Sequence, residues 1–261
     1  MHLHLVDRYR AGTSIAHRLD PRVKILLVLT YIFGLSLAPP GAWASYAAFF
    51  GLALAAAAFS GLGPTFAVRR SYVAVPFILA AAALPFTVPG PTVLSLPVLG
   101  WAVSGPGLVR FVSIAVRTWL AVQAAVLLTA TTPFPDLLWA LGALKVPSAL
   151  VSVVGLMYRY LFLAGDEALR MMRARQARAA ALPAARRPPI WWRGRVAGRM
   201  IGSLFLRAIE RSERVYGAML ARGYDGQSRS LVHFQMSARD WAALGAGLLL
   251  AAGCLGLQGV A

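Results

Sequence analysis

The sequence predicts an all-α polytopic membrane protein with about five transmembrane helices and a cytoplasmic domain of about three helices inserted before the last span. Composition supports this class first: 59% of the 261 residues are hydrophobic and only 13% are charged. Soluble domains usually carry about 25% charged residues. The mean hydropathy is +0.65, and several apolar runs approach the roughly 20 residues that a helix needs to cross a bilayer.

The spans follow these apolar runs in chain order. The first ends before Pro39 and Pro40, and the third contains Pro76 and Pro85, which should bend it because proline interrupts helical hydrogen bonding. The five predicted spans cover residues 23–37, 43–59, 72–88, 108–131 and 241–257.

Positive charge predicts the orientation. The formal net charge is +17, and seventeen of the 26 basic residues lie between the fourth and fifth spans. Long apolar runs make the positive-inside rule a better account of this excess than nucleic-acid binding, so no nucleic-acid partner is expected. Every basic cluster falls on one side if the N-terminus is cytoplasmic and the C-terminus is outside. The predicted domains are a bundle of four spans (1–133), a cytoplasmic domain (134–239) and a last transmembrane helix (240–261).

The cytoplasmic insertion is too long to be an unstructured loop. Helices are expected at 137–144, 147–178 and about 196–221, with a break at 182–189 that is rich in Ala, Arg and Pro. The first half of the second helix is apolar enough to be a sixth span. That alternative stays open, although a sixth span would place part of the insertion or the C-terminal tail on the side of the membrane that the positive-inside rule disfavours.

The third of these helices ends in an arginine motif. On a helical wheel its polar side carries Arg207, Glu210, Arg211 and Arg214, and Glu210 and Arg214 have the i, i+4 spacing of an ion pair. Arg222 extends this stripe, and Gly223 is a natural C-cap. Taken alone, Ala221-Arg222-Gly223 would be explained by helix capping, with an arginine in the last turn and a glycine that ends the helix. An arginine-striped helix of this kind either lies on anionic lipid or docks in a partner's groove, and Glu210 and Glu213 favour docking.

These residues resemble the transmembrane T component of energy-coupling factor transporters, most closely the cobalt-type (CbiQ-like) members. The resemblance runs through nearly the whole chain. It rests on A-H-R-L-D-P-R-V-K before the first span, T-T-P-F-P-D-L-L-W-A-L after the fourth, M-Y-R-Y-L-F, A-L-R-M-M-R-A-R-Q-A-R and E-R-V-Y-G-A-M-L-A-R-G-Y-D-G.

The resemblance implies a non-enzymatic scaffold in the plasma (inner) membrane. Its expected partners are two ATPase subunits and a substrate-binding membrane subunit of the cobalt type, with or without a small accessory membrane subunit. In the family, two Ala-Arg-Gly-type motifs insert into the ATPases. The second maps to Ala221, Arg222 and Gly223, and the first maps best to Ala177, Arg178 and Ala179, where Ala179 replaces the usual glycine. Ala174-Arg175-Gln176 is an alternative register.

The chain also lacks the signatures of other functions. No G-x-x-x-x-G-K-[ST] occurs, so ATP binding by a P-loop is not expected. The one cysteine, Cys254, excludes a disulfide framework and a cysteine metal site, and neither a cofactor nor a resident metal is predicted. Arg117, in the fourth span without an acidic partner, should face carbonyls, water or another subunit.

Other functions stay as alternatives. A T component that serves nickel or a vitamin differs only in its cargo. A stand-alone secondary transporter would usually need ionisable groups inside its spans. A membrane enzyme acting on a phosphate-bearing lipid would need an acidic metal cluster, and the sequence shows none.

Overall fold

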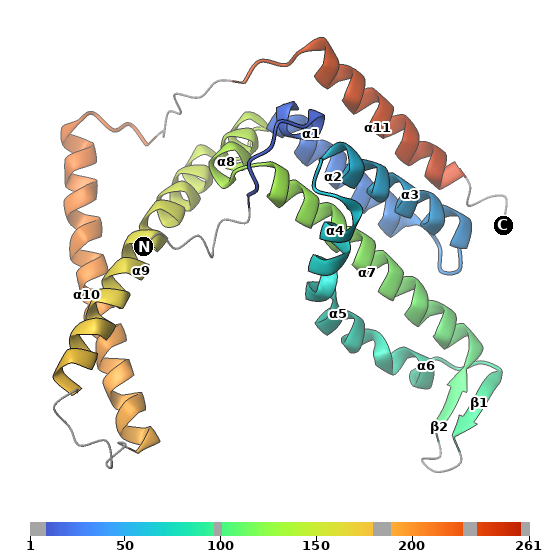
Figure 1. Ribbon diagram of the computed structural model, residues 1–261, viewed down its shortest axis with the longest axis horizontal. Helices are drawn as coiled ribbons and strands as arrows, with labels where there is room; N and C mark the ends of the chain where they lie inside the picture. The colour runs from blue at the N-terminus through green and yellow to red at the C-terminus, as the bar shows by residue number, and fades with distance from the viewer. Residues whose placement is uncertain (1–8, 97–100, 180–188, 227–233, 257–261) are drawn as a thin grey trace. The chain divides into compact units, whose positions relative to one another are not determined.

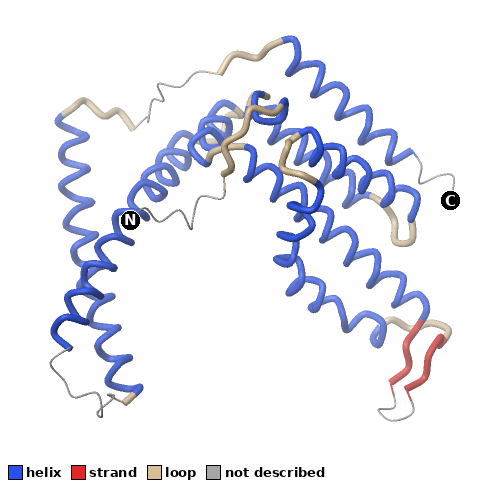
Figure 2. Tube along the Cα trace, in the orientation of Figure 1, coloured by secondary structure: helices blue, strands red, loops and turns tan. Residues whose placement is uncertain are grey.

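The computed structural model describes residues 9–96, 101–179, 189–226 and 234–256 (Figures 1 and 2). Helices make up nearly all of this part of the chain, which confirms the all-α membrane class. The helices are α1 (Ile15–Arg18), α2 (Pro21–Leu37), α3 (Trp43–Phe59), α4 (Pro64–Arg70), α5 (Val75–Ala80), α6 (Leu84–Thr87), α7 (Gly105–Thr131), α8 (Phe134–Ala143), α9 (Ser148–Ala179), α10 (Ile190–Ala221) and α11 (Ala238–Gly256).

One feature was not predicted. Strands β1 (Thr92–Leu96) and β2 (Trp101–Ser104) form an antiparallel hairpin between α6 and α7, between the third and fourth predicted spans.

The chain divides into two compact units, Asp7–Ala140 with Val232–Ala261, and Leu141–Leu231. In the first unit α2, α3, α7 and α11 pack together. Their core contains Leu35, Phe49 and Leu120, all at most 1% exposed. The Tyr31 hydroxyl donates to the Phe49 carbonyl oxygen at 3.0 Å, so this buried polar group is satisfied within the bundle. The first unit is therefore a helical bundle closed by the last helix of the chain.

The third predicted span is a broken helix. Short 3₁₀ turns at Ser71–Ala74 and Ala81–Ala83 separate α4, α5 and α6. Pro76 and Pro85 stand in the first turns of α5 and α6, where proline costs no helical hydrogen bond. The bends expected at these two prolines are confirmed.

Among the residues that the structure describes, four helical segments are long and apolar enough to cross a membrane by length and composition: Thr65–Thr87, Gly105–Thr131, Ser148–Arg178 and Ala238–Gly256. Helix α3 is a shorter apolar helix, Trp43–Phe59. Segment Ser148–Arg178 contains the stretch that the sequence left open as a sixth span.

Gly107 allows α7 to begin close against α6. A Cβ at this position would lie 2.7 Å from the Leu84 carbonyl oxygen and 2.9 Å from the Pro85 Cα. Backbone atoms cannot move aside cheaply, and overpacking a tight site costs about 1–3 kcal/mol. Gly107→Ala should therefore lower the midpoint of thermal unfolding in detergent, whereas Gly253→Ala, which meets no atom within 4 Å, should not.

A buried polar cluster joins the beginnings of α2 and α11 to the end of α7. Lys24 Nζ donates to the carbonyl oxygens of His17 and Thr131, both at 3.3 Å, and to Thr132 Oγ1 at 3.2 Å. Asp240 Oδ1 accepts from the Asp20 backbone N–H at 3.0 Å. Asp20, Lys24 and Asp240 are all less than 9% exposed. The motif A-H-R-L-D-P-R-V-K thus places charged groups inside the bundle, where they tie distant parts of the chain together.

Arg117 lies on α7 against the turn that follows α2. Its Nε donates to the Tyr46 hydroxyl at 2.9 Å, and its Nη2 donates to the Ala38 carbonyl oxygen. Tyr46 in turn donates to the Pro39 carbonyl oxygen at 2.8 Å. Of the three surroundings expected for Arg117, the structure shows a backbone carbonyl, that of Ala38 at the end of α2. The Tyr46 hydroxyl is a further partner that was not expected.

Candidate coupling site

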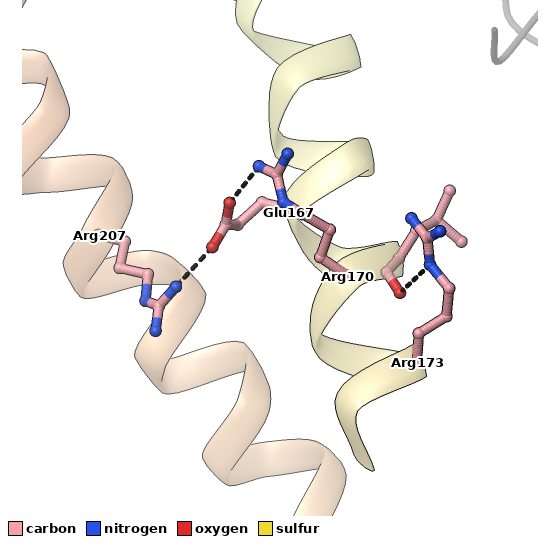
Figure 3. Close-up of polar contacts among 5 residues, drawn as sticks. Glu167, Arg170, Arg173 and Arg207 are labelled. Carbon is pink, nitrogen blue, oxygen red and sulfur yellow. Dashed lines mark hydrogen bonds and ion pairs between the residues drawn. The ribbon is translucent and has the colours of Figure 1, made fainter. Parts of the chain in front are cut away.

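The second unit is built on helices α9 and α10, which cross. Glu167 of α9 accepts from Arg207 Nη1 of α10 at 2.5 Å and from Arg170 Nη2 one turn further along α9 (Figure 3). The Glu167 side chain is 13% exposed, whereas both arginine side chains are more than half exposed. The hydrogen bond from Arg170, and then the one from Arg207, hold the pKa of Glu167 below its ordinary value. The Glu167–Arg207 ion pair therefore joins α9 to α10 at the crossing, and Arg170, on the same helix as Glu167, binds the second carboxylate oxygen.

Glu167→Gln should loosen this crossing, because an amide oxygen accepts weaker hydrogen bonds than a carboxylate does. We expect faster amide hydrogen exchange over residues 160–178 and 200–214. Glu210→Gln is the matched control, since Glu210 forms no ion pair with a described residue, and equal exchange in the two variants would contradict the role of Glu167. Because the pKa of Glu167 is lowered in the folded chain, the contact should persist at neutral pH and weaken only as acid protonates the carboxylate.

Helix α10 ends in a Schellman motif that presents Arg222. Gly223 has φ +77°, its N–H donates to the Leu220 carbonyl oxygen at 2.9 Å, and the Tyr224 N–H donates to the Met219 carbonyl oxygen at 3.0 Å. Both bonds match the expected pattern. The Arg222 side chain at the cap is exposed and makes no hydrogen bond or ion pair with a described residue. The capping interpretation of Gly223 is confirmed, and it leaves the guanidinium of Arg222 available.

Arg178 stands in the last turn of α9 and is also exposed. With Arg175 and Arg199 it lines a hollow of about 580 Å³, whose wall includes Trp192. Arg175, the alternative register, is half-buried there. Ala179 continues the helix, so a glycine cap like that of Gly223 is not seen within the residues described here.

The two arginine motifs lie on opposite sides of the helix crossing. Arg178 follows Glu167 by eleven residues and Arg222 follows Arg207 by fifteen, which correspond to about 16 Å and about 22 Å of helix. Because the two helices run in opposing directions from the Glu167–Arg207 contact (Figure 1), the motifs point away from each other. The second unit therefore offers two separate basic ends rather than one continuous site.

The predicted polar stripe of α10 is only partly right. Arg207 is an internal contact, and Arg211 lines a hollow of about 570 Å³ between α9 and the end of α10. The spacing of Glu210 and Arg214 suggested an ion pair, but these two described residues do not form one. Both side chains are exposed, and solvent-exposed pairs of this spacing gain only about 0.3–0.5 kcal/mol.

Two features escaped the sequence predictions. Glu167 was not singled out, because its importance depends on a partner 40 residues away. Helix α10 begins at Ile190 rather than near 196, and Pro189 just before the first turn was a usable signal for that start.

The apolar half of α9 faces charged groups of α10. The hollow between the two helices is lined by Leu156 and Tyr160 from α9 and by Arg211 and Glu213 from α10. Charged side chains are costly in the hydrocarbon core. Two charged residues of α10 line the same hollow as the apolar half of α9.

Comparison with known proteins gives a consistent result. The family model described as cobalt transport protein (CbiQ) matches residues 12–234. The cobalt transport protein CbiQ of Rhodobacter capsulatus is 32% identical over 59% of this chain and 63% of its own length. The nickel permease LarQ of Lactiplantibacillus plantarum is 29% identical over 56% of this chain and 50% of its own length. An energy-coupling factor transporter transmembrane protein, EcfT, of Lacticaseibacillus paracasei is 28% identical over 96% of this chain and 97% of its own length.

Proposed function

The chain belongs to the cobalt transport protein (CbiQ) family of energy-coupling factor T components, and we propose from this premise that it couples two separate ATPase subunits to a substrate-binding membrane subunit. The observation that carries the proposal is the free guanidinium of Arg222 on a capped helix end. A planar guanidinium has five donors suited to carboxylates and carbonyls in a partner's groove. Arg178 is the second anchor, on the opposite side of the helix crossing.

In this proposal α8, α9 and α10 lie in the cytoplasm, with the N-terminus inside and the C-terminus outside. Segment Ser148–Arg178 is apolar enough to span, but Arg211 and Glu213 line the same hollow as its apolar half. Positive charge supports the same side, because α10 and its flanks carry much of the basic excess. The five-span topology is therefore preferred to six spans.

Cysteine labelling tests this orientation. Gly217 on α10 meets no atom within 4 Å of an added Cβ, so Gly217→Cys in a Cys254→Ser background should fold normally. A membrane-impermeant maleimide should label it only after the cells are lysed. Labelling in intact cells would place α10 outside and remove the proposal.

The exposed apolar side chains of this unit fit contact with a membrane partner. Leu150, Val153 and Met157 of α9 are each about 60% exposed. Contiguous exposed apolar side chains commonly mark interaction sites. Two crossed helices held by Glu167 could tilt together when the ATPases close, as in shear motions of packed elements.

Cobalt is the proposed cargo. The matching family is described as cobalt transport protein, and a relative of comparable identity is called a nickel permease, so nickel is the second candidate. Uptake of radioactive cobalt and nickel should be measured in cells that express this chain with its own ATPase and substrate-binding subunits. We expect ATP-dependent cobalt accumulation that disappears when this chain is omitted. Accumulation that persists without the chain would reject the coupling function, and accumulation of nickel alone would reject cobalt.

A further inference from the structure

The beginning of α10 differs in charge from its end. Between Asp166–Glu167 and Glu210 the sequence has no acidic residue but contains ten arginines. Three of them, Arg193, Arg195 and Arg199, lie in the first three turns of α10, and all three are exposed. None forms an ion pair with a residue that the structure describes. This part of the helix therefore carries uncompensated positive charge, unlike the later turns, where Glu210 and Glu213 are interleaved.

The same turns expose large apolar side chains. Ile190 is 80% exposed and Trp191 is 86% exposed. They line a shallow hollow with Gly194 and Arg195, whereas Trp192 lines a different hollow, the one that contains Arg178. Trp191 thus belongs to a surface separate from the predicted ATPase motif. The region composed of Ile190, Trp191, Arg193, Gly194 and Arg195 is named the α10 entry surface.

We propose that the α10 entry surface anchors the second unit to anionic lipid at the inner face of the membrane. Tryptophan is enriched at the level of lipid headgroups because its ring is apolar and its N–H is polar. Clusters of arginine beside such rings are attracted to anionic lipid. An acidic protein groove would match the charge, but it does not account for a tryptophan that stands free beside the arginines. This inference rests on the cytoplasmic placement of α10 in the proposed function, but lipid binding by this surface does not require an ATPase.

The test compares two glycines of α10. Gly194 and Gly217 are both helical, and neither meets another atom within 4 Å of an added Cβ. In a Cys254→Ser background, Gly194→Cys and Gly217→Cys are labelled with a fluorophore whose emission shifts to the blue in lipid. The whole chain is reconstituted without ATPases into nanodiscs of phosphatidylcholine, with or without phosphatidylglycerol, and with a spin-labelled lipid as quencher.

We expect the label at residue 194, but not the one at 217, to shift to the blue and to be quenched about twofold more when phosphatidylglycerol is present. Raising the salt should reverse the effect, since screening weakens attraction between exposed charges. Trp191→Ala and the double variant Arg193→Gln, Arg195→Gln should each reduce it.

Equal quenching at the two positions would overturn the proposal, and so would quenching that ignores phosphatidylglycerol. Protection of residue 194 only after the ATPases are added would show instead that the surface binds protein. The comparison of lipid compositions is made in discs without ATPase. A negative result in that comparison therefore leaves the proposed coupling function intact, and a failure of transport coupling leaves the lipid result intact.

Discussion

Arg222→Ala is expected to cause the largest functional loss of any single substitution in this chain. Truncating an arginine at the centre of a protein interface commonly costs about 2 kcal/mol or more, roughly a thirtyfold loss of affinity. Arg222 has no internal partner among the described residues, so the substitution should leave the fold unchanged. The ATPase subunits should co-purify poorly with the variant, and cobalt uptake should fall in proportion.

A matched control is Arg173→Ala, because Arg173 is also an exposed arginine, and among the described residues its Nε donates to the Leu169 carbonyl oxygen of its own helix. The Arg173→Ala variant should retain association with the ATPases and cobalt uptake.

Gly223→Ala is a second test of the C-terminal end of α10. The left-handed conformation at φ +77° costs a non-glycine residue about 1–2 kcal/mol, so this variant should present the unchanged Arg222 less well and give an intermediate loss. Full activity of Arg222→Ala would eliminate this end of α10 as an ATPase anchor.

Asp240→Ala should produce the largest loss of stability. Asp240 is 5% exposed, and its carboxylate accepts from the Asp20 N–H, the Ser237 N–H and the Ser237 hydroxyl. Alanine leaves the buried Asp20 N–H without its partner, and a buried donor left unpaired costs about 1–3 kcal/mol, with more for a charged contact. The start of α11 also loses the capping-box contact in which Asp240 accepts from the Ser237 N–H.

The chain provides its own reporter for this experiment. Cys254 is buried in α11 and is the only cysteine, so a thiol-reactive fluorogenic dye reports when α11 leaves the bundle. The unfolding midpoint should fall markedly for Asp240→Ala and less for Asp240→Asn, whose amide oxygen can still accept from the Asp20 N–H. Arg239→Ala, an exposed neighbour, should match the wild type. Identical midpoints for Asp240→Ala and Arg239→Ala would show that the buried contact contributes nothing.

Local signals in the sequence predicted the helices well. The helix predicted at 147–178 lies within about one residue of the observed bounds of α9, Ser148–Ala179, and Gly223 correctly ended α10. These features depend on backbone conformations that single residues favour or forbid. The start of α10 was placed about six residues too late, since the helix begins at Ile190, directly after Pro189.

Contacts between distant residues could not be predicted in the same way. The shared carboxylate of Glu167 and the Asp20–Asp240 contact join positions 40 and 220 residues apart. Neither follows from helical spacing, because each depends on how helices meet. Arg117 was expected to need a partner, and only the structure identifies the Ala38 carbonyl oxygen and Tyr46.

The contact between Asp20 and Asp240 has a consequence for biogenesis. The two residues are 220 positions apart, so at about 5–20 residues per second a ribosome needs roughly 10–40 s to produce the second after the first. During that interval α2 lacks its contact with α11, and the Asp20 N–H lacks its acceptor on Asp240. A nascent chain that stops before its final helix should therefore be recognised by quality-control proteases, and the cell should accumulate almost none of it.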